Sequence, residues 1–255
     1  MISDPTHRFS SRVENYVKYR PDYPPAVLDV LRDTCGFTPD AAVADIGSGT
    51  GIFSELLLKN GNPVFGVEPN AAMRAAAERL LAGYPRFTSV DGTAEATTLP
   101  AGSVAFITAA QAFHWFDHEH TRPEFARILQ SGGWIVLVWN VRRLDSSLFL
   151  RAFEDLLNTY GTDYSEVRDK HPELQQVQTF VGSEPVTLTT LEHRQFFDFD
   201  GLTGRLLSSS YAPESDHPNH GPMLASLAAI FLTHQNAGLV SFDYDTQIYT
   251  ARLSS

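Results

Sequence analysis

Short apolar runs alternate with amphipathic segments through the first half of the chain. Five runs have the length and composition of buried strands, at residues 42–46, 63–68, 86–90, 104–108 and 134–139. Apolar residues recur at helical spacing between them, over 51–59, 71–81 and 122–129. Gly132 and Gly133 predict a turn before the fifth strand. Strands that alternate with helices predict a parallel sheet covered on both faces, with a doubly wound topology.

The second half of the chain has a less regular pattern. Helical spacing recurs over 146–160, 202–207 and 224–234, whereas residues 161–184 are polar and predict no element. Residues 186–199 have the composition of a strand region. Apolar and polar residues alternate over 239–253, which places every second residue from Phe242 to Thr250 on one face. The pattern therefore predicts a terminal strand pair that extends the sheet in antiparallel fashion.

The net charge of the chain limits the classes of binding partner that are expected. The 255 residues include 19 Lys and Arg against 30 Asp and Glu, a net charge of −11. An acidic chain repels phosphate backbones and anionic lipid, so nucleic acid and a membrane surface are not expected as partners. Cys35 is the only cysteine, which excludes an intrachain disulfide and a cysteine-rich zinc site. With no signal-peptide pattern and no apolar run near 20 residues, a cytoplasmic location is expected.

The strongest chemical signal is the glycine-rich segment at residues 45–51, DIGSGTG, between a predicted strand and a predicted helix. Glycines allow a sharp turn and a close approach by a ligand. The dinucleotide fingerprint is G-x-G-x-x-G, but here Ile52 stands where its last glycine would be. This spacing disfavours a nicotinamide-dependent oxidoreductase. A purely structural turn is the simpler alternative.

Glu68 ends the second predicted strand, 17 residues after Gly51. An ionised carboxylate offers several acceptor sites and can bind both hydroxyls of a ribose. The alternative is a solvated acid at a strand end.

Several segments in the right order resemble class I S-adenosylmethionine-dependent methyltransferases. Residues 43–51 resemble the first motif of that family, and 67–70 with Met73 resemble its ribose-binding segment. Residues 91–95, 108–115 and 127–133 resemble the segments that follow the third and fourth strands and precede the fifth. Residues 19–24 and 113–117 are similar to the trans-aconitate methyltransferase-like small-molecule subgroup. The resemblance covers about residues 40–140.

The resemblance implies S-adenosyl-L-methionine as the cofactor. Gly47, Ser48 and Gly49 would approach its amino-acid part, Glu68 its ribose, and Gln111 and Ala112 its methionine. The other cofactor-binding residues expected are Tyr19, Asp45, Gly51, Pro69, Met73, Thr93, Ala94 and Glu95. Arg20 would pair with the methionine carboxylate, because a guanidinium matches a carboxylate; a surface helix is the equal alternative for its segment. Asp45 would orient the glycine loop or reach the methionine ammonium.

Other polar and aromatic residues follow the fourth and fifth strands. His114 is the candidate general base, although binding the cofactor or substrate is its simpler role. The substrate-side candidates are His114, Trp115, Trp139, Asn140, Arg143 and Tyr211. His114, His118 and His120 form no convincing metal site, since no further ligand cluster accompanies them, and Asp117 is expected to be an N-cap. Residues 109–112 lack the pattern typical of amino methylases acting on nucleic acids.

The expected fold is a doubly wound, mostly parallel, seven-stranded Rossmann-like sheet with an antiparallel terminal strand and a helical cap insertion. One domain would contain an N-terminal lid and helix (1–36), a cofactor-binding core (40–141), a cap with substrate-side elements (142–238) and a terminal strand (239–255). The expected function is methyl transfer to a small-molecule acceptor, at a carboxylate or a hydroxyl, by a monomer or homodimer. The alternatives are a non-catalytic S-adenosylmethionine-binding module and, less favoured, the oxidoreductase.

Overall fold

The computed structural model describes residues 18–165 and 172–253, which form one seven-stranded sheet. The strand order is β3-β2-β1-β4-β5-β7-β6. The strands are β1 (Val43–Ile46), β2 (Val64–Val67), β3 (Phe87–Val90), β4 (Val104–Ala110), β5 (Leu129–Arg142), β6 (Thr187–Phe197) and β7 (Val240–Arg252). The first five are parallel, and β7 pairs antiparallel with both β5 and β6. The predicted doubly wound sheet and its antiparallel extension are confirmed.

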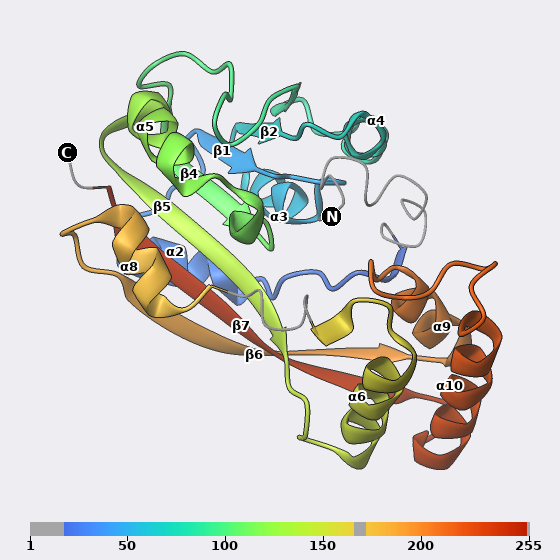
Figure 1. Cartoon of the computed structure of the whole chain (residues 1–255). Helices are drawn as coiled ribbons and strands as arrows, with labels where there is room; N and C mark the ends of the chain where they lie inside the picture. The colour runs from blue at the N-terminus through green and yellow to red at the C-terminus, as the bar shows by residue number, and fades with distance from the viewer. Residues whose placement is uncertain (1–17, 166–171, 254–255) are drawn as a thin grey trace.

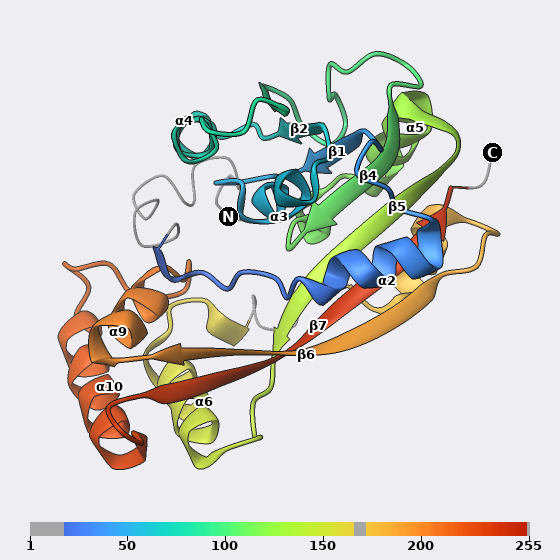
Figure 2. The same ribbon diagram turned by 180° about the vertical axis from the view of Figure 1, so that it is seen from behind.

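Helices cover both faces of the sheet because the strands are apolar on both sides (Figure 1). Apolar side chains of α2 (Ala26–Cys35) and α3 (Ile52–Asn60) pack on one face. Those of α5 (His118–Ile128) and α8 (Leu174–Val181) pack on the other. Figure 2 shows α2 lying across the long strands from behind. The helix α4 (Ala71–Leu80) begins at Asn70, whose side chain accepts the amides of Ala72 and Met73, as an N-cap should.

A second core lies where β6 and β7 run beyond the parallel strands. The helices α6 (Leu148–Tyr160), α9 (Phe199–Leu207) and α10 (His220–His234) gather there around Phe242 and Tyr244 (Figure 1). We call these three helices the cap. The segment predicted as cap, 142–238, also contains β6, which belongs to the sheet. The predicted face of β7 is buried from Phe242 to Thr250. Residues 1–17 of the predicted lid lie outside the described residues.

The boundary before the fifth strand was predicted wrongly, and α8 lies within residues 161–184, where no element was predicted. A helix over 122–129 and a glycine turn were expected before the fifth strand. The helix α5 instead occupies His118–Ile128, and β5 begins directly at Leu129, which pairs with Val104. Gly132 takes a positive φ of 74° inside the strand, where the register with β4 shifts. The two glycines therefore accommodate an irregularity within a strand.

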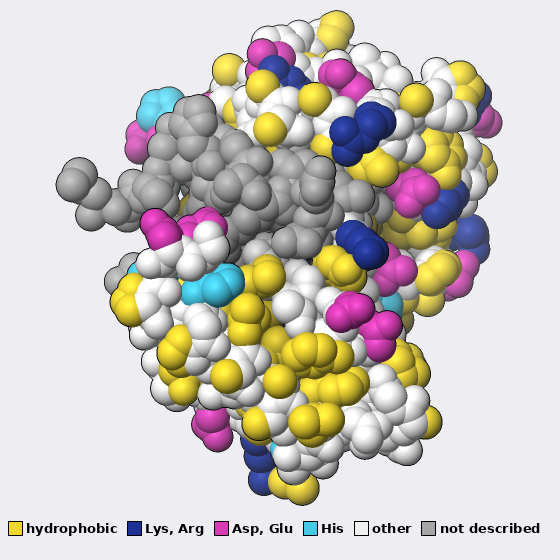
Figure 3. Space-filling model, turned by 90° about the vertical axis from the view of Figure 1, so that its right-hand side faces the viewer, with side chains coloured by type: hydrophobic (Ala, Val, Ile, Leu, Met, Phe, Trp, Pro, Cys, Tyr) yellow, Lys and Arg dark blue, Asp and Glu magenta, His cyan; other side chains and the backbone are white. Residues whose placement is uncertain are grey.

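Hydrophobic side chains gather on the lower half of the face shown in Figure 3. Leu148 of α6 and Leu232 of α10 are among the most exposed large apolar residues of the described chain. Isolated exposed leucines are ordinary on protein surfaces, so these two do not indicate a binding partner. The choice between monomer and homodimer stays a prediction. In the described ranges, no helix is both long enough and apolar enough to cross a membrane.

Candidate active site

The glycine loop lies at the carboxyl end of β1, beside the point where the strand order reverses between β1 and β4. The amides of Gly47 and Ser48 both donate to the carbonyl of Val67, at 2.8 and 3.2 Å, so the loop is tied to β2. Gly47 has a φ of 67°, and a Cβ added there would lie 2.6 Å from the Cβ of Ala112. Only glycine therefore fits between the loop and the segment that follows β4.

Gly51 serves the fold and lines no part of the cavity described below. Its φ is 86°, and an added Cβ would lie 2.6 Å from the Leu81 side chain after α4. Its amide donates to the carbonyl of Ser48 at 2.9 Å. The turn itself therefore uses this amide.

Asp45 is the last residue but one of β1 and is 1% exposed. Its two carboxylate oxygens accept the hydroxyls of Ser54, at 2.6 Å, and Thr108, at 2.8 Å. Burial raises the pKa of this carboxyl group to about 6, although the two hydroxyl hydrogen bonds act in the opposite direction. Asp45 thus links the loop, α3 and β4, and its side chain also reaches the cavity wall.

Glu68 holds the glycine loop from the end of β2. Its carboxylate accepts the amides of Gly49 and Asn70, each at 2.9 Å. Burial raises the pKa of Glu68, against these hydrogen bonds and the charge of Arg74. Arg74 also donates to the carbonyls of Glu68 and Pro69. Glu68, which was predicted to bind a ribose, therefore contacts the glycine loop directly and is held by several hydrogen bonds.

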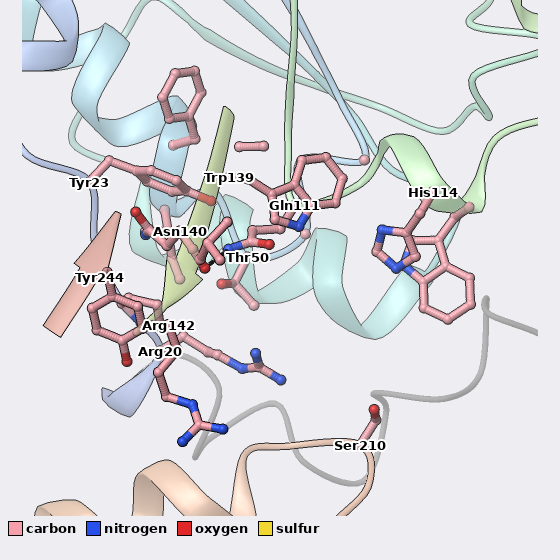
Figure 4. Close-up of a pocket in the computed structure, with 18 of the residues that line it drawn as sticks. Arg20, Tyr23, Thr50, Gln111, His114, Trp139, Asn140, Arg142, Ser210 and Tyr244 are labelled. Carbon is pink, nitrogen blue, oxygen red and sulfur yellow. Dashed lines mark hydrogen bonds between the residues drawn. The ribbon is translucent and has the colours of Figure 1, made fainter. Parts of the chain in front are cut away.

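A cavity of about 290 Å³ opens above this loop, between the carboxyl ends of the strands and the cap (Figure 4). It is a site of the kind that doubly wound sheets place at their switch point. Eleven of the predicted site residues line it: Arg20, Asp45, Gly47, Ser48, Gly49, Gln111, His114, Trp115, Trp139, Asn140 and Tyr211.

Ten other predicted site residues do not line this cavity: Tyr19, Gly51, Glu68, Pro69, Met73, Thr93, Ala94, Glu95, Ala112 and Arg143. Most of them follow β2 or β3 in the sequence. Met73 and Ala94 among them are buried. The carboxylate of Glu95 accepts the amide of Asp117 and the hydroxyl of Thr121, so it braces the start of α5. The ring of Tyr19 packs on Gly204 of α9.

Arg143 was predicted to lie on the substrate side, but it does not line the cavity. Its guanidinium binds Asp245 at 2.6 Å and Glu192 at 2.9 Å, away from the cavity, whereas the neighbouring Arg142 lines it. Arg143 follows the last residue of β5, and its two carboxylate partners hold its side chain away from the cavity. The prediction named Arg143, and Arg142 is the arginine of this segment that lines the cavity.

The segment after β4 brings aromatic and amide groups to the cavity. Gln111 has a positive φ of 59°, an uncommon conformation for a residue other than glycine, and its Nε2 donates to the Asn140 carbonyl at 3.2 Å (Figure 4). Such strain persists where surrounding contacts hold it, often at functional sites. The His114 ring lies 4.5 Å from that of Trp115 and 5.4 Å from that of Trp139, between centroids.

The other two histidines of this segment have structural contacts. His118 stacks on Phe113, with 4.2 Å between ring centroids, and His120 lies 2.8 Å from the carboxylate of Asp117. Asp117 also accepts the amides of Glu119 and His120 as the N-cap of α5, as predicted. Within the described ranges, no three His, Cys, Asp or Glu residues are grouped as metal ligands would be.

Several lining residues were missed by the prediction: Thr50, Arg142, Tyr164, Arg205 and Tyr244. Arg142 donates through Nη2 to Glu154 at 2.6 Å and to the Tyr164 hydroxyl at 2.7 Å. Thr50 belongs to the glycine loop, Arg142 to β5, Arg205 to α9 and Tyr244 to β7, and Tyr164 follows α6, so only the tertiary fold brings them together. The alternation along β7 indicated that Tyr244 is buried, and no pattern indicated that it lines the cavity with the arginines.

Asn140 is expected to be a structural tie of the site. Its Nδ2 donates to the Asp22 carbonyl at 3.0 Å, and its Oδ1 accepts the Thr246 hydroxyl at 2.6 Å. We expect Asn140→Ala to lower the free energy of unfolding by roughly 1–3 kcal/mol, because it leaves buried groups without partners. Urea denaturation measures this loss. Asn158→Ala, at an exposed position on α6, is the control, and an equal effect of both variants would contradict the expectation.

The fold and this cavity define a doubly wound α/β protein with a ligand site at the switch point. Residues 44–137 match the family model of the methyltransferase domain. An uncharacterized methyltransferase of Mycobacterium tuberculosis is 38% identical over 165 residues, which cover 64% of this chain and 62% of that protein. One from Geobacillus thermodenitrificans is 30% identical over 155 residues, covering 56% and 68%. The chain belongs to the methyltransferase family, and it spans less than two thirds of the mycobacterial relative.

Solved structures share the whole fold. A protein from Anaeromyxobacter dehalogenans is similar with a TM-score of 0.65 and 24% identity, covering 91% of this chain and 97% of its own. Phosphoethanolamine N-methyltransferase 2 from Haemonchus contortus, solved in complex with S-adenosyl-L-methionine, has a TM-score of 0.58 and 13% identity. The match covers 99% of this chain and 59% of the nematode protein.

Proposed function

We propose that this protein transfers a methyl group to a small-molecule acceptor bound in the cavity between the glycine loop and the cap. S-adenosylmethionine is the cofactor. The observation that supports the acceptor site is the cavity itself. Its lining includes residues of the loop after β1, of the ends of β4 and β5, and of the cap. The resemblance to the trans-aconitate methyltransferase-like subgroup remains part of this proposal.

The residues of the loop fit such a cofactor. A Cβ at Gly49 would meet no atom within 4 Å, so the loop presents an open surface at that position. The Thr50 hydroxyl beside it is buried and has no hydrogen-bond partner in the structure. Open space next to an unsatisfied buried hydroxyl suits a polar ligand. We assign the amino-acid part of the cofactor to this side of the cavity, near Asp45 and Arg20.

The adenosine part is assigned to residues outside the cavity wall. Glu68 would bind the ribose hydroxyls, since each carboxylate oxygen can accept more than the one amide it now holds. Pro69 and Met73 would pack against the adenine, with Thr93, Ala94 and Glu95 at its edge. Glu95 would have to serve this role while it braces α5.

When bound, the cofactor supplies an activated methyl group on a sulfonium. The chain's own part is to align the acceptor and exclude water, which can provide most of the catalysis for such a displacement. The aromatic residues Trp115 and Trp139 and the cap line the cavity on the proposed acceptor side. His114 would take a proton only from an acceptor that must lose one. A carboxylate acceptor is already ionised and would not need to lose a proton.

The Glu68 carboxylate provides the direct test of this function. We expect Glu68→Ala to weaken the binding of S-adenosylhomocysteine by about 10- to 100-fold, since charge-assisted hydrogen bonds to the ribose are lost. Calorimetric titration measures the affinity, and Glu78→Ala, exposed on α4, is the control. Absence of binding to the unmodified protein at millimolar concentration would overturn the proposal, as would preferential stabilisation by a nicotinamide dinucleotide.

A further inference from the structure

The cap side of the cavity is rich in arginine. Arg20 from the N-terminal segment, Arg142 from the end of β5 and Arg205 from α9 all line it. Among the lining residues in the described ranges, Asp45 is the only carboxylic acid, and its hydroxyl partners hold it on the side of the glycine loop. A protein with a net charge of −11 thus has a cationic wall inside its cavity.

Arg142 is only partly satisfied by the protein. Its side chain is 11% exposed, and its Nη2 is bound to Glu154 and Tyr164. Its Nη1 is buried and has no hydrogen-bond partner in the structure. A buried donor that stays unpaired costs free energy, so such a group in a cavity wall points to an acceptor atom supplied by a ligand. In Figure 4 the side chains of Arg20 and Arg142 extend in the same direction, toward the loop with Ser210.

Two tyrosines of the same wall support this interpretation. Tyr244 is 1% exposed, and its hydroxyl also lacks a hydrogen-bond partner. For Tyr211, burial alone would raise the pKa of the phenol, but the charges of Arg205, Arg142 and Arg20 and a hydrogen bond with Ser209 bring the pKa below its usual value. The positive charge of this wall therefore contributes to an effect that outweighs desolvation.

The charge of the wall also selects against other ligands. A protonated amine would be repelled at short range in a partly desolvated cavity. A neutral acceptor could offer the Arg142 Nη1 only an ordinary hydrogen bond, which is weaker than one to an ionised oxygen. An oxyanion can accept from the Arg142 Nη1 and the Tyr244 hydroxyl together, and charge-assisted hydrogen bonds of this type are the strong ones.

We propose, on the basis of the methyltransferase function above, that the acceptor has an oxyanion group, a carboxylate or phosphate, which Arg142 binds with help from Arg205 and Tyr244. This group is an anchor. A guanidinium draws electron density from the oxygens that it binds, so the methyl group goes to a different nucleophilic atom of the acceptor. There the new bond to the methyl carbon forms as the sulfur–carbon bond breaks, and the sulfur keeps the electron pair.

The test uses the full chain saturated with S-adenosylhomocysteine and calorimetric titration of four small probes. Succinate and phosphoglycolate are the two oxyanion sources, succinamide is the neutral control, and 1,4-diaminobutane is the cation. We expect at least one oxyanion to bind at least about tenfold more tightly than succinamide, and the diamine not to bind. Tighter binding of succinate or of phosphoglycolate identifies the carboxylate or the phosphate as the anchor.

Two variants assign the effect to Arg142. Arg142→Gln should weaken oxyanion binding by about 10- to 100-fold, whereas Arg143→Gln, the adjacent arginine outside the cavity, should not. Arg142→Lys keeps the charge beside Glu154 and serves if the glutamine variant does not fold; it should bind more weakly than the unmodified protein because the planar fork is lost. The affinity for S-adenosylhomocysteine alone should stay unchanged in all three.

Three results would overturn the inference. The first is an oxyanion affinity no greater than that of succinamide. The second is an equal effect of the Arg142 and Arg143 variants. The third is a parallel loss of S-adenosylhomocysteine affinity in the Arg142 variants, which would assign this arginine to the carboxylate of the cofactor. Failure of the unmodified protein to bind S-adenosylhomocysteine at all would instead reject the proposed function on which the inference rests.

Discussion

Gly47→Ala is expected to abolish the binding of S-adenosylhomocysteine while the protein still folds. The added Cβ would lie 2.6 Å from the Ala112 Cβ, well inside van der Waals contact. The loop cannot retreat freely, because the amides of Gly47 and Ser48 are both bound to the Val67 carbonyl. The loop and the segment after β4 must therefore separate, and these are the two sides of the proposed cofactor site. We expect an affinity loss of at least about 100-fold.

The control for this substitution is Gly36→Ala at the end of α2. Gly36 has nearly the same φ, 66° against 67°, but an added Cβ there meets no atom within 4 Å. Both variants should lose roughly 1–2 kcal/mol of stability from the left-handed backbone, and only the Gly47 variant should lose binding. Adding Ala112→Gly should restore part of the affinity. Equal binding by the Gly47 and Gly36 variants would contradict this account of the loop.

The second large effect expected is on the pH dependence of stability, through Asp45. Burial raises the pKa of this group from 3.8 to about 6 in the folded protein. The folded state therefore binds the proton more tightly than the unfolded state, so this contribution is complete below pH 4 and is lost as the pH rises through 6. The loss is on the order of 3 kcal/mol.

Asp45→Asn mimics the protonated acid and should remove this part of the pH dependence. Urea denaturation at pH 4, 5, 6 and 7 measures the free energy of unfolding of both proteins. We expect the variant to be the less pH-sensitive between pH 4 and 6, with the remaining slope due to groups such as Glu68, whose pKa is also raised. Asp29→Asn, at an exposed ion pair on α2, should leave the slope unchanged. Identical slopes for all three proteins would refute the assignment.

The sheet could be predicted because its strands have unambiguous patterns. The central parallel strands are mostly apolar, and every second residue of β7 from Phe242 to Thr250 is buried. The start of β5 could not be predicted. A helical pattern followed by two glycines is also typical of a helix that ends in a turn. What decides the outcome is the pairing of Leu129 with Val104, a contact that no local pattern encodes.

The site was predictable on the side of the glycine loop and much less so on the side of the cap. The loop functions through local backbone geometry, which leaves a motif in the sequence. The cap side depends on tertiary contacts at the end of β5, where Arg142 lines the cavity and Arg143 binds Asp245. Arg205 and Tyr244 line the same cavity but lie far from Arg142 in the sequence, where no spacing rule applies.

The continuous strands also determine how the protein can move. The ladder between β5 and β7 runs from Trp134–Arg252 to Arg142–Tyr244, and that between β7 and β6 extends to Val240–Phe197, beneath the cap. A hinge needs residues whose backbone torsions can change together, and a hydrogen-bonded ladder offers none without breaking. The paired strands therefore run without a break from the core to the cap. Adaptation to an acceptor of another shape is expected to come from substitutions in the cavity wall.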